Sequence, residues 1–457
     1  MKRALFFWLC LFLAGCVNLS PDYAVPDLGQ PLPPAFKEGW KTADPADERE
    51  RGPWWRAFAD PDLNRLMDYL EAGNQDIAQA AANLRSARTR IMAARAAFFP
   101  GVSLPASYTR SGREGGPITS SASAGISAQW EISFWNSLPA LEAARADAQA
   151  AAADFATLRL SAQAELAQSY FQLRALDEQE ALYESTLRAY ARALRLTRNQ
   201  YRGGIITPAD VAQAEARLAG AESELLAVRR DRATLEHGIA LLCGQVPAAF
   251  SLAHGRLSAA LPAIPAVLPA ALLERRPDIA AAERRVAAAN QRIGIARAAW
   301  FPTLSLSGSR SAEAAGWALS PLTVWSLGPG AALSLFQGGR RLADNEAARA
   351  DYEASVAAYR QTVLTAFAEV EDLLSALDLL AGQAKAERRA AEAARRALNL
   401  ALSQYEGGMT TYLQVVSAQA TLLLNERNVI LLEGRRLASA VGLIKALGGG
   451  WEKESRP

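Results

Sequence analysis

The stretch ARAAFFP at residues 94–100 occurs again as ARAAWFP at residues 296–302. Farther along, AARAD at 143–147 recurs at 347–351, and Tyr201 with Gly203-Gly204 recurs as Tyr405 with Gly407-Gly408. Self-similarity at a fixed spacing is the signature of a repeated structural unit. The chain is therefore read as a tandem duplication. Its join lies in 244–270, where Pro247, Pro262, Pro265 and Pro269 interrupt regular structure, and this segment is expected to be a strap between the halves.

Each half is expected to contain a helix, two strands and a very long helical hairpin. No proline separates Pro139 from Pro208, and the only glycines in that interval are Gly203 and Gly204. A single helix of roughly 60 residues fits there and would extend ~90 Å. In the second half, apolar residues between 352 and 377 recur at steps of three and four, which is typical of a helix packed on helices.

Four segments alternate between apolar and polar residues with a period of two, the pattern of β-strands. The longest runs from Ser123 to Phe134, with Ile126 on one face and Ser127 on the other. The expected strands cover about 101–113, 119–134, 302–312 and 323–337. About ten residues per strand is the length of a transmembrane β-segment, although a half-buried soluble sheet would show the same alternation.

The N-terminus has the order of a secretion signal. Lys2 and Arg3 precede an apolar run that ends in Leu13-Ala14-Gly15-Cys16. This ending resembles a bacterial lipobox, which predicts cleavage before Cys16 and a covalent lipid on its thiol and amine. The alternative is an ordinary signal peptide with an incidental cysteine. Val17 follows where an inner-membrane retention aspartate would stand, which favours the outer membrane.

Composition excludes several function classes. Lys plus Arg total 49 against 47 Asp plus Glu, so net charge gives no reason to expect a nucleic-acid partner. His237 and His254 are the only histidines, and neither has metal-ligand spacing; no catalytic residues, metal site or cofactor other than the Cys16 lipid are expected. Cys243 has no disulfide partner and is interpreted as a packing residue.

Taken together, these motifs resemble the TolC-like outer-membrane factor family, in its lipoprotein branch that serves resistance-nodulation-division (RND) efflux pumps. The residues that carry the resemblance are Gly15-Cys16, Pro21-Asp22-Tyr23, Trp54-Trp55 with Asp60-Pro61, RRPDI at 275–279, and 296–302. The resemblance implies a mainly α fold with a transmembrane β portion: a homotrimer whose twelve-stranded β-barrel continues into a long α-helical periplasmic barrel. It also implies a periplasmic adaptor (membrane fusion) protein, an inner-membrane RND-type pump and outer-membrane lipid as partners.

The function expected from this resemblance is the exit duct of a tripartite efflux system for drugs or other small molecules. The chain would be lipid-anchored in the outer membrane and extend into the periplasm. A lipid-anchored periplasmic coiled-coil scaffold is the alternative; it would share the long helices but would have no use for four strands of membrane length.

The expected segments follow the duplication. They are a lipoprotein signal peptide at 1–15, an anchor and extended segment at 16–60, a first repeat at 61–243 with its hairpin at about 138–243, a strap at 244–270, a second repeat at 271–447 with its hairpin at about 340–447, and a C-terminal tail at 448–457.

The hairpin tips are the candidate functional site. Glycine tolerates the positive φ of a tight helix-to-helix turn, so Gly203-Gly204 and Gly407-Gly408 are predicted to mark the tips and to contact the adaptor. The resemblance implies a periplasmic gate in which a tyrosine and an arginine of the second hairpin reach an aspartate of the first. Tyr405 and Asp210 match, but Thr410 replaces the arginine, and Gln414 and Ser417 replace ring aspartates. A weaker latch of neutral hydrogen bonds is the hypothesis, and simple packing of Tyr405 is the alternative.

Overall fold

The computed structural model describes residues 19–27, 52–257, 261–262, 276–315 and 322–449. Cys16 and the predicted signal peptide lie outside the described residues, as do parts of the predicted strap and of the predicted C-terminal tail. The chain divides into two compact units. Unit 1 comprises Met1–Pro33, Ala81–Phe155 and Asp278–Val363; unit 2 comprises Pro34–Ala80, Ala156–Pro277 and Leu364–Pro457.

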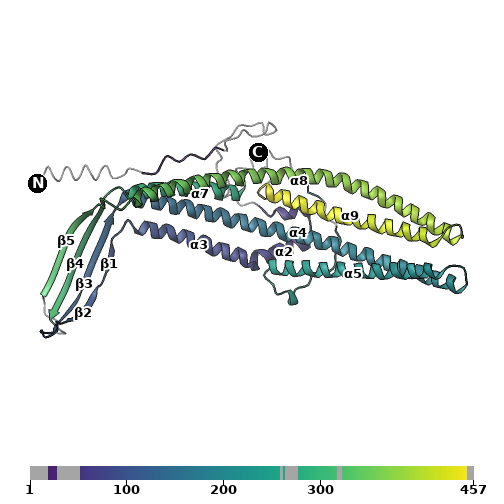
Figure 1. Cartoon of the computed structure of the whole chain (residues 1–457), viewed down its shortest axis with the longest axis horizontal. Helices are drawn as coiled ribbons and strands as arrows, with labels where there is room; N and C mark the ends of the chain where they lie inside the picture. Colours follow the sequence, from purple (N-terminus) through teal and green to yellow (C-terminus); the bar gives the residue numbers. More distant parts are fainter. Residues whose placement is uncertain (1–18, 28–51, 258–260, 263–275, 316–321, 450–457) are drawn as a thin grey trace. The chain divides into compact units, whose positions relative to one another are not determined.

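Unit 1 contains an antiparallel sheet built from β1 (Gly101–Ser103), β2 (Ala106–Ser111), β3 (Thr119–Ile132), β4 (Thr303–Ala315) and β5 (Leu322–Ala332). β3 pairs with β1 and β2 on one side and with β4 on the other, and β4 pairs with β5 (Figure 1). The repeats thus meet at the β3–β4 pair, where Ser121↔Ala315 runs without a register shift to Ile132↔Leu304.

β1 and β2 form one line in the sheet despite their separate bounds. Ser103 faces Ser127 and Ala106 faces Ala124, so the register is the same on both sides of the gap. Pro105 lies in the gap and cannot donate a hydrogen bond, yet its carbonyl accepts one from the Gly125 N–H at 3.0 Å. The single strand expected at about 101–113 is therefore interrupted by one missing donor and ends at Ser111.

The two faces of the sheet differ in chemistry. One carries cross-strand pairs of hydroxyls, including Ser103 with Ser127 at 2.7 Å and Ser309 with Ser326 at 2.8 Å. On the other, Ile126 is 56% exposed and Trp325 is 74% exposed. A sheet with one polar face and one exposed apolar face has not buried its hydrophobic surface within this chain.

Two strands end earlier than expected. The strand predicted at about 119–134 ends at Ile132, because the Ser133 carbonyl accepts hydrogen bonds from Asn136 and Ser137 and so starts a helix. The strand predicted to reach 337 ends at Ala332, which faces Thr303, the first residue of β4. Beyond that point the described residues offer no partner strand, and the chain passes through Gly338 and Gly339, both of positive φ, into the next helix.

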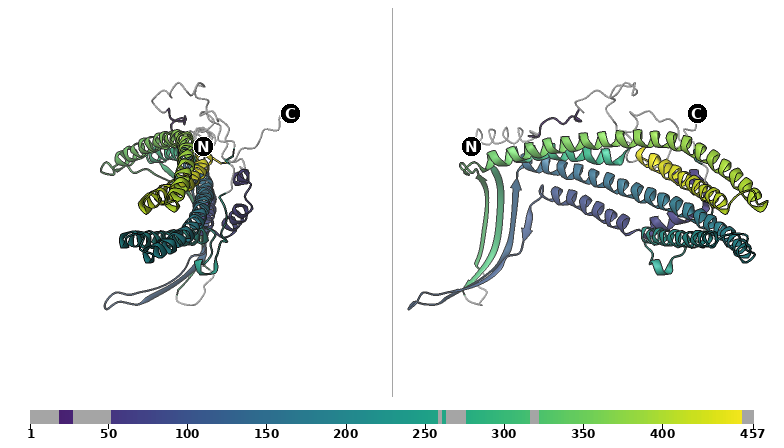
Figure 2. Two further views of the ribbon diagram at one scale, coloured as in Figure 1. Left: turned by 90° about the vertical axis from the view of Figure 1, so that its right-hand side faces the viewer. Right: turned by 45° about the vertical axis from the view of Figure 1, so that its right-hand side comes forward.

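The helices repeat in the two halves. α3 (Gln75–Ala96), α4 (Phe134–Arg202) and α5 (Pro208–Leu242) correspond in order to α7 (Pro277–Ala298), α8 (Arg340–Glu406) and α9 (Tyr412–Ala446). α3 and α7 each have 22 residues, and α5 and α9 each have 35. Figure 2 shows α4 beside α5 and α8 beside α9 as two hairpins. None of the helices in the described ranges has an apolar stretch of the length needed to cross a bilayer.

Unit 2 has its own core where the long helices meet the short N-terminal elements η2 (Trp54–Phe58) and α2 (Pro61–Gly73). Asp60 caps α2 by accepting hydrogen bonds from the amides of Asp62 and Leu63, and it also accepts one from the Tyr170 hydroxyl at 2.7 Å. The Phe58 and Phe171 rings pack with centroids 4.9 Å apart. Cys243 is buried beside α2, and burial raises its thiol pKa to about 11, which fits a packing role.

Candidate functional site

The two hairpin tips have the same backbone design. At the end of α4 the Gly203 N–H donates to Asn199 and the Ile205 N–H to Gln200; at the end of α8 the Gly407 N–H donates to Ser403 and the Met409 N–H to Gln404. The positive φ falls on the second glycine of each pair, 74° at Gly204 and 72° at Gly408. Such turns satisfy the last carbonyls of a helix and favour glycine because it has no Cβ.

The tips differ in how the return helix begins. In the first turn of α5, the Asp210 carboxylate accepts hydrogen bonds from the Thr207 amide at 3.1 Å and from the Thr207 hydroxyl at 2.8 Å. Before α9, Thr411 precedes Tyr412, and Gln414 stands at the position of Asp210. Asp210 therefore stabilises its own helix N-terminus and completes a capping box.

Tyr405 lies inside a small core between the hairpins of unit 2. Its buried ring is 5.5 Å from that of Tyr412, and its hydroxyl donates a hydrogen bond to Gln200 of α4. The core joins the four long helices; its buried members are Leu194, Ala214, Ala401, Tyr405, Tyr412, Val415 and Val416. Burial, followed by the Asp210 charge, raises the Tyr405 pKa, so the hydroxyl stays protonated and can act as a donor.

The structure gives Tyr405 and Asp210 different hydrogen-bond partners, although the Asp210 charge is close enough to contribute to the raised pKa of Tyr405. Tyr405 contacts Gln200, while the carboxylate of Asp210 is engaged by Thr207. Gln414 and Ser417 are both exposed on α9, one turn apart, and Thr410 is partly exposed in the turn. Sequence reasoning missed Gln200; its signal was its place one residue before Tyr201, at the end of the first long helix.

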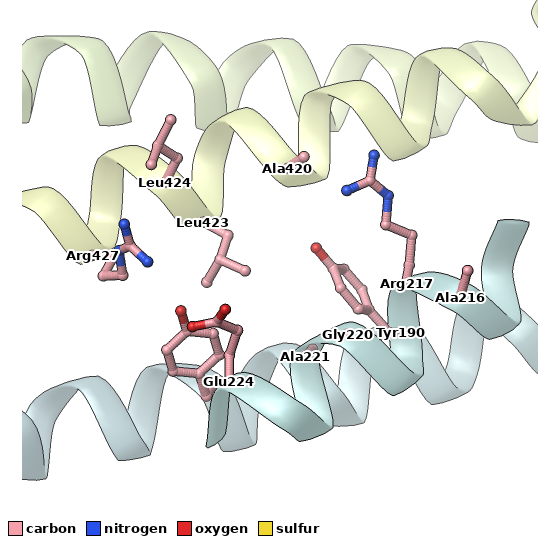
Figure 3. Close-up of a pocket in the computed structure, with 11 residues that line it drawn as sticks. Tyr190, Ala216, Arg217, Gly220, Ala221, Glu224, Ala420, Leu423, Leu424 and Arg427 are labelled. Carbon is pink, nitrogen blue, oxygen red and sulfur yellow. The ribbon is translucent and has the colours of Figure 1, made fainter. Parts of the chain in front are cut away.

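The tips also expose large apolar side chains. Ile205 and Met409, at equivalent positions of the two turns, are 74% and 75% exposed. Farther up the hairpins a cleft of about 310 Å³ opens between α4, α5 and α9 (Figure 3). Tyr190, Arg217 and Glu224 line it from the first hairpin and Arg427 from the second, giving a surface with both charges and aromatic rings.

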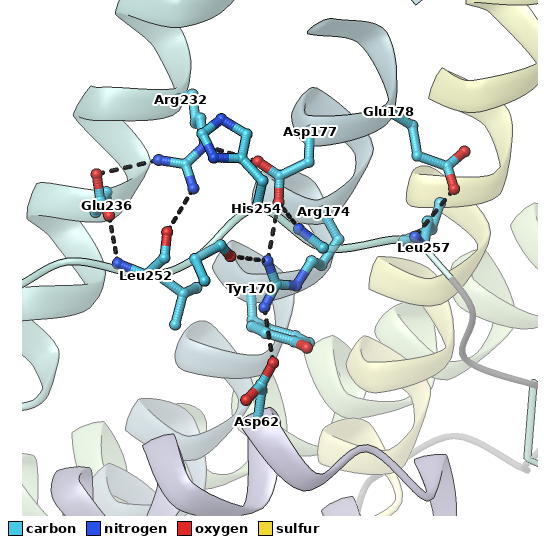
Figure 4. A network of polar contacts seen from close by, with 12 residues as sticks. Asp62, Tyr170, Arg174, Asp177, Glu178, Arg232, Glu236, Leu252, His254 and Leu257 are labelled. Carbon is cyan, nitrogen blue, oxygen red and sulfur yellow. Dashed lines mark hydrogen bonds and ion pairs between the residues drawn. The ribbon is translucent and has the colours of Figure 1, made fainter. Parts of the chain in front are cut away.

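A buried ionic network holds the start of the strap against the first hairpin (Figure 4). The carboxylate of Asp177 accepts hydrogen bonds from Arg174 at 2.9 Å, Arg232 at 2.7 Å and the Gly255 amide at 3.0 Å. The two guanidiniums donate in turn to the strap carbonyls, Arg174 to Ala253 and Arg232 to Leu252, each at 2.7 Å. Sequence reasoning missed this network entirely.

Residues 19–27 lie along α7 in unit 1. The Ser20 hydroxyl donates to Gln291 at 2.7 Å, and the Asn290 amide donates to the Pro21 carbonyl at 2.7 Å. Gly294 permits this close approach, since a Cβ there would lie 2.2 Å from the Ser20 oxygen. The short segment that follows the predicted lipid attachment site is thus fixed to the helix that leads into β4.

Comparison with known proteins decides the family. The model of the outer membrane efflux protein family matches residues 66–245 and 268–449. The chain belongs to this family. It is 32% identical to the pyoverdine export outer membrane protein OpmQ of Pseudomonas aeruginosa, over 99% of this chain and 98% of that protein. It is 28% identical to the probable outer membrane lipoprotein SilC of Salmonella typhimurium, with 96% of each chain covered.

Solved structures agree with this assignment. The outer-membrane channel OprN matches with a TM-score of 0.84 and 32% identity, covering 94% of this chain and 99% of that one. CusC, a transmembrane channel, matches with a TM-score of 0.82 and 26% identity. The fold of this outer membrane efflux protein is therefore TolC-like, and its location is the outer membrane. It acts as an exit duct in efflux, and its family is one of channels rather than enzymes.

Proposed function

We propose that the protein works as a homotrimer whose twelve-stranded β-barrel crosses the outer membrane and continues as a tunnel of long helices. The observation that carries this proposal is the sheet of unit 1. In the described residues β5 pairs only with β4, and the β1–β2 line pairs only with β3, so the sheet has two open edges. Unsatisfied backbone groups at such edges are too costly in hydrocarbon, and closure against other copies satisfies them.

The faces of the sheet fit the same arrangement. The apolar face with Ile126 and Trp325 suits lipid, and the hydroxyl-bearing face with Ser127 and Ser309 suits a water-filled lumen. Most of this lining is hydroxyls and glycine, and its charged residues in the described strands are Glu131 and Glu313. Such a lining is consistent with a cargo of varied small molecules whose selection lies in the pump.

The partners in this proposal are a periplasmic adaptor and an inner-membrane RND-type pump. The exposed Ile205 and Met409 at the tips, and the cleft lined by Arg217 and Arg427, offer apolar and charged contacts for an adaptor. Lipidation of Cys16 would anchor the chain to the membrane in addition to the barrel. The contacts of residues 19–27 with α7 favour this second anchor, because only a few residues separate Cys16 from Ser20, which is bound to the helix.

Disulfide trapping between the two open edges tests the trimer. Each variant carries two cysteines in the same chain, one on β5 between 323 and 329 and one on β2 between 106 and 110. We expect some pairs to give covalent dimers and trimers in outer membranes, with no larger species. Buried Cys243, whose thiol pKa is raised, can stay in place because it is a poor nucleophile.

The matched control places the same cysteines on β3, at 123 and 127, where both neighbours belong to the same chain. These pairs should give no intermolecular bond. A ladder that stops at dimers, or edge pairs that never cross-link while remaining reactive to a thiol reagent, would contradict the homotrimer.

A further inference from the structure

Charge is segregated between the two faces of the sheet. The charged residues in the described strands are Arg110, Glu131, Arg310 and Glu313. Arg310 faces Ile126 on β3 and Trp325 on β5, so it lies on the apolar face. Arg110 faces Ser120, whose side chain shares the side of Ile126, because side chains two residues apart share a face.

Both carboxylates lie on the opposite face. Glu313 faces Ser123, and Glu131 is displaced from Ser123 by an even number of residues. The hydroxyl face thus carries only negative charge in the described strands, and the apolar face only positive charge. Within the described part of the chain, no hydrogen bond or ion pair engages the guanidinium of either arginine, and both residues are exposed.

We propose that this apolar face binds the phosphate groups of a phosphorylated glycolipid of the lipid A type in the outer leaflet, through Arg310 and Arg110. The inference rests on the proposed function, since it requires this face to meet lipid. A guanidinium in hydrocarbon is costly, and pairing with a phosphate relieves that cost while matching its planar, bidentate geometry.

The positions of the arginines along the strands favour the outer leaflet. The end of the sheet at Ile132 and Leu304 connects to the helices, so it is the periplasmic end. In a tilted barrel strand the rise from Leu304 to Arg310 is about 15 Å, which is past the middle of an apolar band about 25 Å tall. From there an arginine side chain can extend toward the outer headgroups.

Arg110 lies farther out on the same face. Its partner Ser120 is separated from Ile126, the partner of Arg310, by about another 15 Å of rise. That height is at or above the outer edge of the apolar band, where phosphates lie. Tyr108 faces Ala122, four residues farther out than Ile126 on the same face, and is 43% exposed; an aromatic side chain at that height is typical of the headgroup boundary.

The test uses the full-length oligomer in phosphatidylethanolamine nanodiscs that contain bisphosphorylated lipid A, and counts retained lipid by native mass spectrometry. Replacing both arginines, R110Q with R310Q, should weaken lipid A retention at least tenfold. The pair R110K with R310K keeps the charge and should retain most of the binding. The matched control R389Q removes an exposed arginine from α8 and should change nothing.

Comparison of different lipids shows which phosphate the protein binds. Dephosphorylated lipid A should bind the unaltered protein as weakly as lipid A binds the glutamine variant, and phosphatidylglycerol should compete poorly. The inference is overturned if the glutamine variant retains lipid A fully, or if phosphatidylglycerol competes equally at the same phosphate concentration.

Cysteine labelling distinguishes an incorrect lipid A site from an incorrect barrel assignment. Cysteines at 126 and 127 report which face meets water. If both react equally with a water-soluble thiol reagent, the proposed barrel fails; if only 127 reacts and lipid A retention is unaffected by the arginine changes, only the lipid site fails.

Discussion

The family resemblance and the structure give the Tyr405 hydroxyl different hydrogen-bond partners. The family resemblance points to Asp210, whereas the structure gives the hydroxyl to Gln200 and gives Asp210 to the capping of α5. Tyr405 nevertheless joins the two hairpins, because Gln200 belongs to α4 and Tyr405 to α8. Packing and latching are therefore compatible here: the buried ring fills the core between the hairpins, and its hydroxyl fixes their relative position at the tip.

Loss of these contacts should loosen the periplasmic entrance. Tyr405→Phe removes one neutral hydrogen bond, worth about 0.5 to 1.5 kcal/mol, and Asp210→Ala removes a cap worth about 1 kcal/mol. We expect the double variant to have a higher closed-state conductance in single-channel recordings. Tyr201→Phe is the control, since Tyr201 is the exposed counterpart in the first repeat. An unchanged closed-state conductance would leave Tyr405 with a packing role alone.

Sequence reasoning reached the glycines of this site but not its hydrogen bonds. A positive φ at Gly204 and Gly408 is a local property, and the repeated Gly-Gly pairs predict it. The choice between Gln200 and Asp210 depends on how α4 and α8 are rotated against each other. That rotation is set by side-chain packing across the whole core and leaves no local mark in the sequence.

For the strands, too, the sequence predicts one property and not another: it locates the strands but not their ends. Alternation located β3 and β4 because a period of two is strong when one face is apolar. It did not locate their ends: Phe134 continues the alternation but opens α4, and Leu333 and Leu335 continue it beyond the last partner residue of β4. Pairing ends a strand, and pairing is not encoded in the alternation of a single segment.

The two faces of β3 should respond differently to charge. Ile126→Arg places a second guanidinium on the proposed lipid face, directly opposite Arg310, and should destabilise the folded protein by roughly 2 to 4 kcal/mol. Ser127→Arg places it in the proposed lumen and should fold normally but lower the conductance for cations. Urea unfolding in lipid vesicles and bilayer recordings measure the two effects. Equal destabilisation by both variants would argue against the assignment of faces.

At the scale of the whole molecule, the duplication was evident from the sequence, and the matching lengths of α5 and α9 express it in the structure. The ionic network at the strap was not foreseen. Arg174, Asp177 and Arg232 look like ordinary helix-surface charges in the sequence, because charged residues are abundant throughout both hairpins. Their burial follows from the path of residues 252–255 across them, and that path is a long-range property.

Breaking this network should be costly. Asp177→Asn keeps the size of the side chain but removes the carboxylate that Arg174 and Arg232 share, leaving Arg174 with Asp62 and Arg232 with Glu236. Removing one partner of a buried ion pair typically costs about 3 to 5 kcal/mol, and the two remaining carboxylates offset part of that cost, so we expect a smaller but clear fall in thermal stability and faster proteolysis within 244–257. The control Asp231→Asn breaks an exposed pair with Arg230 and should leave both unchanged. Equal stability of the two variants would mean that the strap is held by other contacts.

The likeness of the two tip turns has a consequence for the stoichiometry of assembly. In the proposed trimer the ring of tips has six positions, identical in their Gly-Gly backbone and alternating between Asp210 and Gln414 at the start of the return helix. An adaptor that recognises only the shared turn would find six equivalent sites and could pack as a hexamer. One that discriminates the carboxylate from the amide would find three, and the junction would then have threefold rather than near-sixfold symmetry.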